Sequence, residues 1–156
     1  MEEETVRWLT AEEQHAWRSF VRLHEKLGGR LSRLLQTQSK LSAADFAVLV
    51  QLTDAPEGRQ RYQDLARELE WEKSRMSHHI ARMAGRGLVV REECLEDARG
   101  AFVVITEAGR AAIEAAAPLH VEAVRELFLD HVTPAELRTL GEISGRVVAK
   151  LDEDQS

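Results

Sequence analysis

The hydrophobic period of the chain changes at Gly87, and no other feature of the sequence constrains the fold as strongly. Before this glycine, residues 62–71 and 74–86 have apolar side chains at helical spacing, and the connection between them, "WEKS", is short. After it, "LVVREEC" and "AFVVIT" are short, apolar and rich in β-branched residues, and a polar turn containing Gly100 separates them. Two short helices with a brief connection, followed by a hairpin, predict a winged helix-turn-helix.

Amphipathic helices are predicted on both sides of this module. Residues 10–36 open with the capping box "TAEE" and have apolar side chains at intervals of three and four residues. "LSAADFAVLVQL" predicts a second helix, followed by a loop at "DAPEGR". Residues 107–131 predict a helix kinked at Pro118, and "TPAE" opens a last helix. The expected fold is mainly α with a small β-hairpin wing.

We expect one domain over residues 1–156, with the winged helix-turn-helix over 42–106. The terminal helices, 10–36 and 107–151, have larger apolar faces than so small a central module can bury. A two-fold dimer interface is therefore their expected use. A helical bundle within one chain is the alternative.

Positive charge is concentrated in one part of an acidic chain. The formal net charge is -6, from 21 Lys and Arg against 27 Asp and Glu. Residues 73–91 contain no Asp or Glu, and their basic residues are Lys73, Arg75, Arg82, Arg86 and Arg91. Because screening makes a local patch matter more than the total charge, this segment is suited to phosphate contact. A solvated helix face is the alternative.

Composition and motifs disfavour several other classes. No apolar run approaches the roughly 18 residues of a membrane span, and the amino terminus is acidic where a signal peptide is basic. A single cysteine, Cys94, favours a reducing, cytoplasmic location. Phosphate-binding glycine loops, a GxSxG motif and a nucleophile–base set are absent from the sequence, so neither an enzyme nor a cofactor is expected.

The adjacent histidines His78 and His79 do not have metal-ligand spacing. Two ligands on one helix need a spacing of three or four residues, and no two of the six histidines have it. At 100° per residue, Met76, Ile80 and Met83 share the inward face of the helix. His79 falls about 65° from the centre of that face and is expected to be half-buried, whereas His78 points away from it.

The sequence resembles the MarR (multiple antibiotic resistance regulator) family over about residues 10–150. The resemblance rests on Ser74 and Ser77, on "RGLVVR", on the wing motif "DARG" and on "ITEAGR", in this order and spacing. It implies a homodimer that binds double-stranded DNA at a pseudo-palindromic operator, often as a repressor released by a small-molecule ligand. Tyr62 departs from the family's usual Ser or Thr cap. Arg75 and the histidine pair also depart from it, so base preference cannot be transferred.

The helix over residues 74–86 is the predicted recognition helix. Ser74, His78 and Arg82 face outward, and Arg75 is suited to a bidentate contact with guanine. Arg99, at the tip of the wing, is expected in the minor groove by resemblance. Asp97 is expected to brace the wing by pairing with Arg86 or Arg99, with an ordinary turn aspartate as the alternative. The predicted DNA-contacting residues are Lys73, Ser74, Arg75, Ser77, His78, Arg82 and Arg99.

A ligand cleft is expected between the dimer helices and the winged module. Its candidate lining residues are His15, Trp17, Arg18, Phe20 and Phe46, although the apolar ones fit a protein core equally well. Redox sensing by Cys94 is disfavoured because glutamates surround it in the sequence. The alternative function is a winged-helix protein-interaction or adaptor module that does not bind DNA.

Overall fold

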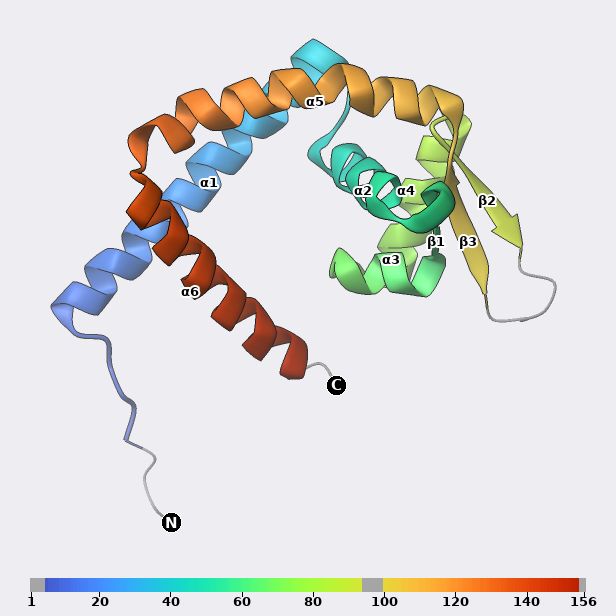
Figure 1. Ribbon diagram of the computed structural model, residues 1–156. Coiled ribbons are helices and arrows are strands. Elements are labelled where there is room, and N and C mark those ends of the chain that lie inside the picture. The colour runs from blue at the N-terminus through green and yellow to red at the C-terminus, as the bar shows by residue number, and fades with distance from the viewer. Residues whose placement is uncertain (1–4, 94–99, 155–156) are drawn as a thin grey trace.

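The computed structural model describes residues 5–93 and 100–154. The chain is mainly helical with one small antiparallel sheet, which confirms the predicted fold class (Figure 1). The elements are, in chain order, α1 (Ala11–Ser39), α2 (Ala43–Asp54), η1 (Pro56–Gly58), β1 (Arg59–Arg61), α3 (Tyr62–Glu68), α4 (Lys73–Gly85), β2 (Val89–Glu93), β3 (Ala101–Ile105), α5 (Glu107–Leu127), η2 (Leu129–His131) and α6 (Pro134–Glu153).

The wing contains a third strand that the sequence did not predict. The sheet order is β1–β3–β2, so the predicted hairpin of β2 and β3 is present and β1 pairs with the other edge of β3. Arg61 lies opposite Phe102 in this pairing. The predicted loop "DAPEGR" ends at Arg59, and the three residues "RQR" show no apolar alternation that would predict a strand. β1 is a strand only because β3 supplies its hydrogen-bond partners.

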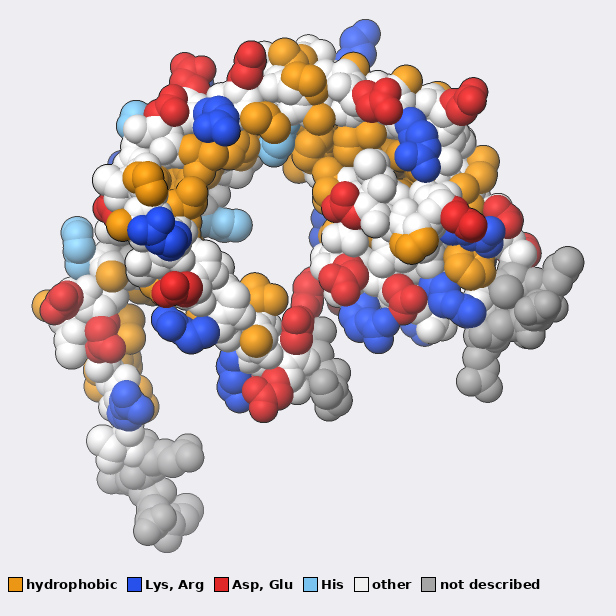
Figure 2. Space-filling view, viewed as in Figure 1, with side chains coloured by type: hydrophobic (Ala, Val, Ile, Leu, Met, Phe, Trp, Pro, Cys, Tyr) orange, Lys and Arg blue, Asp and Glu red, His pale blue; other side chains and the backbone are white. Residues whose placement is uncertain are grey.

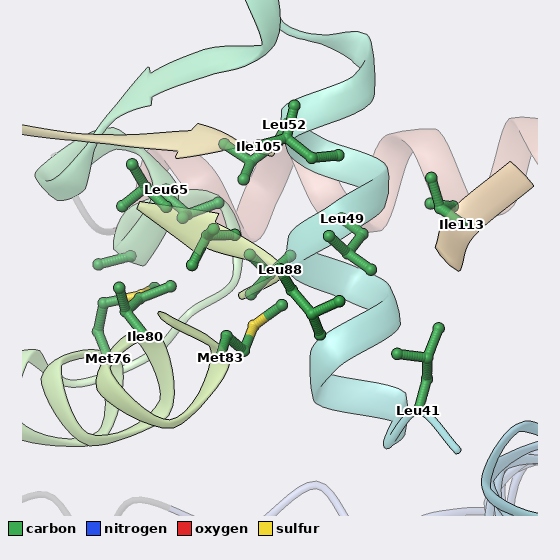
Figure 3. Packing of buried hydrophobic residues seen from close by; sticks show 14 of the residues in the cluster. Leu41, Leu49, Leu52, Leu65, Met76, Ile80, Met83, Leu88, Ile105 and Ile113 are labelled. Atoms are coloured by element: carbon green, nitrogen blue, oxygen red, sulfur yellow. The ribbon is translucent and has the colours of Figure 1, made fainter. Parts of the chain in front are cut away.

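The core of the winged module lies between α2, α3, α4 and the sheet. In Figure 3, Leu52 of α2 lies beside Ile105 of β3, and Leu88 lies between Leu49 of α2 and Met83 of α4. The predicted inward face of α4 is confirmed, because its three apolar residues Met76, Ile80 and Met83 are 0%, 3% and 0% exposed. Burying such side chains stabilises the fold by about 1.5–3 kcal/mol each and fixes the opposite face of α4 outward.

The helix boundaries follow the capping signals of the sequence. Thr10 and Ser42 each form the expected capping box, and so does Thr133 at the start of α6. The 107–131 prediction was too long, since α5 ends at Leu127 and a short 3-10 turn follows. Pro118 lies inside α5, which continues through it as one helix.

The terminal helices form an arch beside the winged module. α5 runs from the wing along the top, α1 packs against it, and α6 returns below them (Figure 1). The space-filling view shows an open space between α6 and the winged module (Figure 2). α6 buries no residue within the chain. Except for Val90, the exposed large apolar residues of the described chain all lie outside residues 41–105.

A close contact joins the start of α5 to the base of the wing. The Thr106 hydroxyl donates to the Gly87 carbonyl over 2.6 Å, and the Gly109 N–H donates to the Thr106 hydroxyl over 3.0 Å. A Cβ atom on Gly109 would lie 2.2 Å from the Leu88 carbonyl oxygen and 2.9 Å from Ile105. Only glycine allows this approach, so α5 begins in direct contact with the segment that links α4 to β2.

We expect Gly109→Ala to lower the free energy of unfolding by at least about 1–3 kcal/mol, because the added methyl group overpacks a backbone contact. Chemical denaturation monitored by circular dichroism measures this loss. Gly85→Ala is the matched control, since nothing lies within 4 Å of a Cβ at that position. Equal stability of the two variants would show that the Gly109 contact is not tight in solution.

Candidate nucleic-acid interface

The outer face of α4 is polar, basic and free of acidic side chains. The structure places all of the predicted contacts on α4, namely Lys73, Ser74, Arg75, Ser77, His78 and Arg82, on exposed positions. The first turn contains no acidic residue, although the helix amino terminus favours one. The N-cap residue is Glu72, whose side chain makes no hydrogen bond to the first turn. This face is of the right size to enter a DNA major groove.

Arg75 and Ser77 contact two aromatic residues outside α4, one in the α3–α4 connection and one in α3. The guanidinium carbon of Arg75 lies 4.5 Å from the ring centroid of Trp71. The hydroxyl of Tyr62 donates to the Ser77 hydroxyl over 2.8 Å, so Tyr62 connects the start of α3 to α4. Tyr62 is the first residue of α3, and the N-cap is Arg61, which makes no side-chain cap bond.

An open groove lies beside the amino end of α4. Its volume is about 520 Å³, and it extends from α3 and α4 to the sheet. Arg91 of β2 borders it and lies 5.6 Å over the Tyr62 ring. The residues that line it are Tyr62, Gln63, Ala66, Trp71, Lys73, Ser77, Arg91 and Ala101. The combination of two cationic side chains, hydroxyl groups and aromatic rings suits a sugar–phosphate backbone.

A buried carboxylate holds α4 against α2. The Asp45 carboxylate, on a residue that is 4% exposed, accepts hydrogen bonds from the Ser42 backbone N–H over 2.9 Å and from Arg86 over 2.8 Å. The Asp45 backbone N–H donates in turn to the Ser42 hydroxyl, which completes the capping box at the start of α2. His79 Nε2 lies 2.9 Å from the other carboxylate oxygen, outside hydrogen-bond geometry, so this contact is electrostatic. Arg82 lies 3.2 Å from His79 Nδ1 on the opposite side of the ring.

His79 is buried rather than half-buried, which corrects the sequence prediction. Only 7% of the residue is exposed, because Asp45 and Trp71 cover it and Asp45 compensates part of its lost hydration. Burial lowers the pKa of His79, Asp45 opposes this effect, and Arg82 and Arg75 add to it. The pKa of Asp45 is also lowered: burial raises it, but the hydrogen bonds from Ser42 and Arg86 outweigh burial.

Arg86 binds the buried carboxylate and the connection between α1 and α2. Its two terminal nitrogens bind Asp45 over 2.8 Å and the Lys40 carbonyl over 2.7 Å, so it ties α4 to the α1–α2 connection. Asp97 and Arg99, the other residues of the predicted wing contact, lie outside the described residues, as does Cys94. The roles predicted for these three residues remain predictions.

The candidate ligand residues do not meet within one chain. Trp17 and Phe20 are 58% and 52% exposed on the amino-terminal half of α1, where His15 and Arg18 are exposed as well. Phe46 packs against His120 of α5, with ring centroids 4.6 Å apart. At about 1.5 Å per residue, Phe20 lies roughly 28 Å from the end of α1, after which α2 begins. A single chain therefore does not form the predicted cleft.

The described residues contain neither a metal-binding cluster nor a membrane-spanning helix. Within residues 5–93 and 100–154, no three His, Cys, Asp or Glu side chains are close enough to share a metal ion. No helix in that part of the chain combines the length and the apolar character needed to cross a membrane.

The fold and the basic face of α4 define a winged helix-turn-helix protein. The profile of the MarR family matches residues 41–100. AbsC, a MarR family transcriptional regulator from Streptomyces coelicolor, is 38% identical to this chain with a TM-score of 0.90; the match covers 95% of this chain and 99% of AbsC. Sco3205, a MarR family transcriptional regulator from the same organism solved in complex with DNA, is 39% identical with a TM-score of 0.88, over 95% of this chain and 92% of Sco3205. The chain belongs to the MarR family of transcriptional regulators.

More distant matches show the fold alone. BpsR of Bordetella bronchiseptica, whose DNA binding is regulated by 6-hydroxynicotinic acid, is 24% identical with a TM-score of 0.68. This match covers 83% of this chain and 98% of BpsR. No curated protein sequence matches the chain at a significant level.

We expect the free energy of unfolding to fall as the pH drops below about 6.5, the ordinary pKa of histidine. Because folding lowers the pKa of His79 and of His120, the unfolded chain takes up protons first, and acid then favours unfolding. Equilibrium denaturation at a series of pH values from about 5 to 7.5 measures this slope. His79→Gln should flatten it, whereas His78→Gln, at the exposed neighbouring position, should not. A stability that increases toward acid pH would contradict the expectation.

Proposed function

We propose that this chain is a homodimeric, sequence-specific DNA-binding regulator that reads double-stranded DNA with α4. The observation that carries the proposal is the exposed, acid-free outer face of α4, with Arg75 and Arg82 on it and Lys73 exposed at the amino end of the same helix. The buried face of the same helix is fixed by the core and by Asp45, so the outward side chains are held on a rigid element. The DNA complex of Sco3205, at 39% identity, supports the same use of this fold.

The outward residues of α4 divide into base readers and backbone contacts. Arg75 has the donor geometry for the O6 and N7 atoms of guanine, a contact worth roughly 1–3 kcal/mol of discrimination. Lys73, Ser74 and Ser77 lie at the positive end of the helix, which suits phosphate oxygens. His78 projects from the outer face between them and Arg82. Arg99 would enter the minor groove beside the recognition helix, by resemblance to the family.

The terminal helices would form the dimer. α6 buries nothing within one chain, yet Leu137, Ile143, Val147 and Leu151 line one of its faces and are 43–55% exposed. Trp17 and Phe20 of α1 add further exposed apolar surface. Contact with a second copy would cover these residues and set two α4 helices about 34 Å apart, one turn of DNA, which matches a pseudo-palindromic operator.

Release by a small molecule is the finer part of the proposal. The candidate residues of α1, namely His15, Trp17, Arg18 and Phe20, do not reach Phe46 within one chain, so a cleft containing them would need both copies. A ligand there that binds the DNA-free form more tightly would release DNA, and a coupling of about 1–3 kcal/mol is sufficient for regulation. This mode of action corresponds to a repressor.

We expect the affinity for genomic DNA fragments to fall steeply with salt, because each phosphate contact releases counterions. Binding by fluorescence anisotropy over a salt series gives the slope of log K against log salt. Lys73→Ala should reduce the magnitude of this slope by about one. Arg138→Ala, a charge removal on α6, is the matched control. Fragments that are not retained, together with a protein partner in pull-downs, would instead favour the adaptor alternative.

We expect Val147→Asp to shift the protein from dimer to monomer, because it places a charge in the apolar face of α6. Sedimentation velocity measures the mass in solution. Two residues along a helix point about 160° apart, so Ala149→Asp adds the same charge to the opposite face and should leave the dimer intact. A wild-type protein that is monomeric at micromolar concentration would remove the dimer from the proposal.

A further inference from the structure

Trp71 occupies the connection between α3 and α4, and its backbone is fixed. Its N–H donates to the Ala66 carbonyl over 2.9 Å, so the connection folds back on α3. The side chain is half-buried and packs against the hydrophobic core of the winged module. One part of the indole is therefore anchored in the interior, while another part remains available at the surface.

The indole contacts a buried residue on one side and an exposed residue on the other. The His79 ring meets it edge-to-face, with centroids 5.2 Å apart and planes at 80°. The Arg75 guanidinium lies over it at 4.5 Å. Since Asp45 holds His79 in turn, a continuous series of contacts runs from a buried carboxylate of α2 through Trp71 to a cation on the outer face of α4.

Arg75 differs from two other arginines that lie over aromatic rings, Arg59 and Arg91. Arg59 lies 4.3 Å over Phe102 but also pairs with Glu92 over 3.3 Å, and Arg91 pairs with Glu93 over 3.4 Å. Over the residues that the structure describes, Arg75 has no such ion pair, so its N–H groups are not occupied by a carboxylate.

A stacked guanidinium remains able to bind a base. The ring attracts the flat face of the group, whereas the donors for a bidentate hydrogen bond lie along its edge. Stacking also limits the rotamers of a long side chain, which otherwise loses its freedom only when it binds. Held in this way, Arg75 is oriented before DNA arrives.

We propose that Trp71 is a positioning residue that sets the base specificity of Arg75. The inference rests on the proposed function, because it concerns how α4 reads DNA. Trp71 itself need not touch DNA. It acts by fixing the direction in which Arg75 leaves the helix, so its removal should affect the one base pair that Arg75 reads more than the overall affinity.

The experiment compares the operator with single base-pair substitutions, using the intact dimer. Arg75→Ala first identifies the base pair at which this arginine discriminates. Discrimination is the ratio of the Kd for the substituted site to the Kd for the operator. At that pair, Trp71→Leu should lower the ratio by about two- to five-fold, the range of one exposed cation–π contact. In the Arg75→Ala background, Trp71→Leu should produce no further loss.

Further variants separate positioning from packing. Trp71→Phe keeps a ring under Arg75 and should retain most of the discrimination, and Trp71→Met serves in place of Trp71→Leu if the latter does not fold. Phe102→Leu is the matched control, since it removes a ring under Arg59 and Arg61 instead. Melting curves establish that each variant is folded.

The outcomes distinguish this inference from the proposed function. If the wild type retains no operator fragment, DNA binding itself is absent. If the wild type binds and Trp71→Leu weakens the operator and the substituted site equally, Trp71 only supports the fold, and the inference is overturned. The same conclusion follows if the losses in Trp71→Leu and Arg75→Ala simply add.

Discussion

The burial of one carboxylate, Asp45, determines how the recognition helix is held. Its two oxygens reach the start of α2, the His79 ring and the Arg86 guanidinium, so a single charge joins the amino end of α2 to the middle and the carboxyl end of α4. Removing the carboxylate would leave the buried His79 ring without the group that compensates part of its lost hydration. The hydrophobic core defines which face of α4 points outward. The contact of Asp45 with His79 and Arg86 defines the position of α4 along α2.

The same arrangement separates structural from functional cations within a segment of uniform charge. Arg86 binds Asp45 and the Lys40 carbonyl within the chain, whereas Arg75 and Lys73 are exposed and are the cations that the proposed function assigns to DNA. A positive segment in the sequence therefore overstates the number of side chains available to DNA. The distinction depends on which arginine faces a buried acid, and charge counting alone cannot provide it.

Local signals predicted the helices well and the long-range contacts poorly. The capping box at Thr10 and the inward position of Met76 follow from spacing within a few residues, and both agree with the structure. β1 was missed because its identity as a strand comes from pairing with β3, about forty residues later. The Asp45–Arg86 pair has no local signature either. The Trp71–Arg75 pair did have helical i,i+4 spacing, but Trp71 precedes the helix, so a reading confined to α4 overlooks it.

The tight contact at Gly109 fixes the start of α5 against the winged module. The first turn of α5 packs on the Leu88 carbonyl and is hydrogen-bonded through Thr106 to Gly87. The two parts are therefore joined by direct contact rather than by a flexible linker. A tilt of α5 would therefore carry the winged module, and α4 with it, in the same direction. In a two-fold assembly, small rotations of the paired long helices would change the separation of the two α4 helices by ångströms. This separation would determine which spacing of operator half-sites fits the dimer.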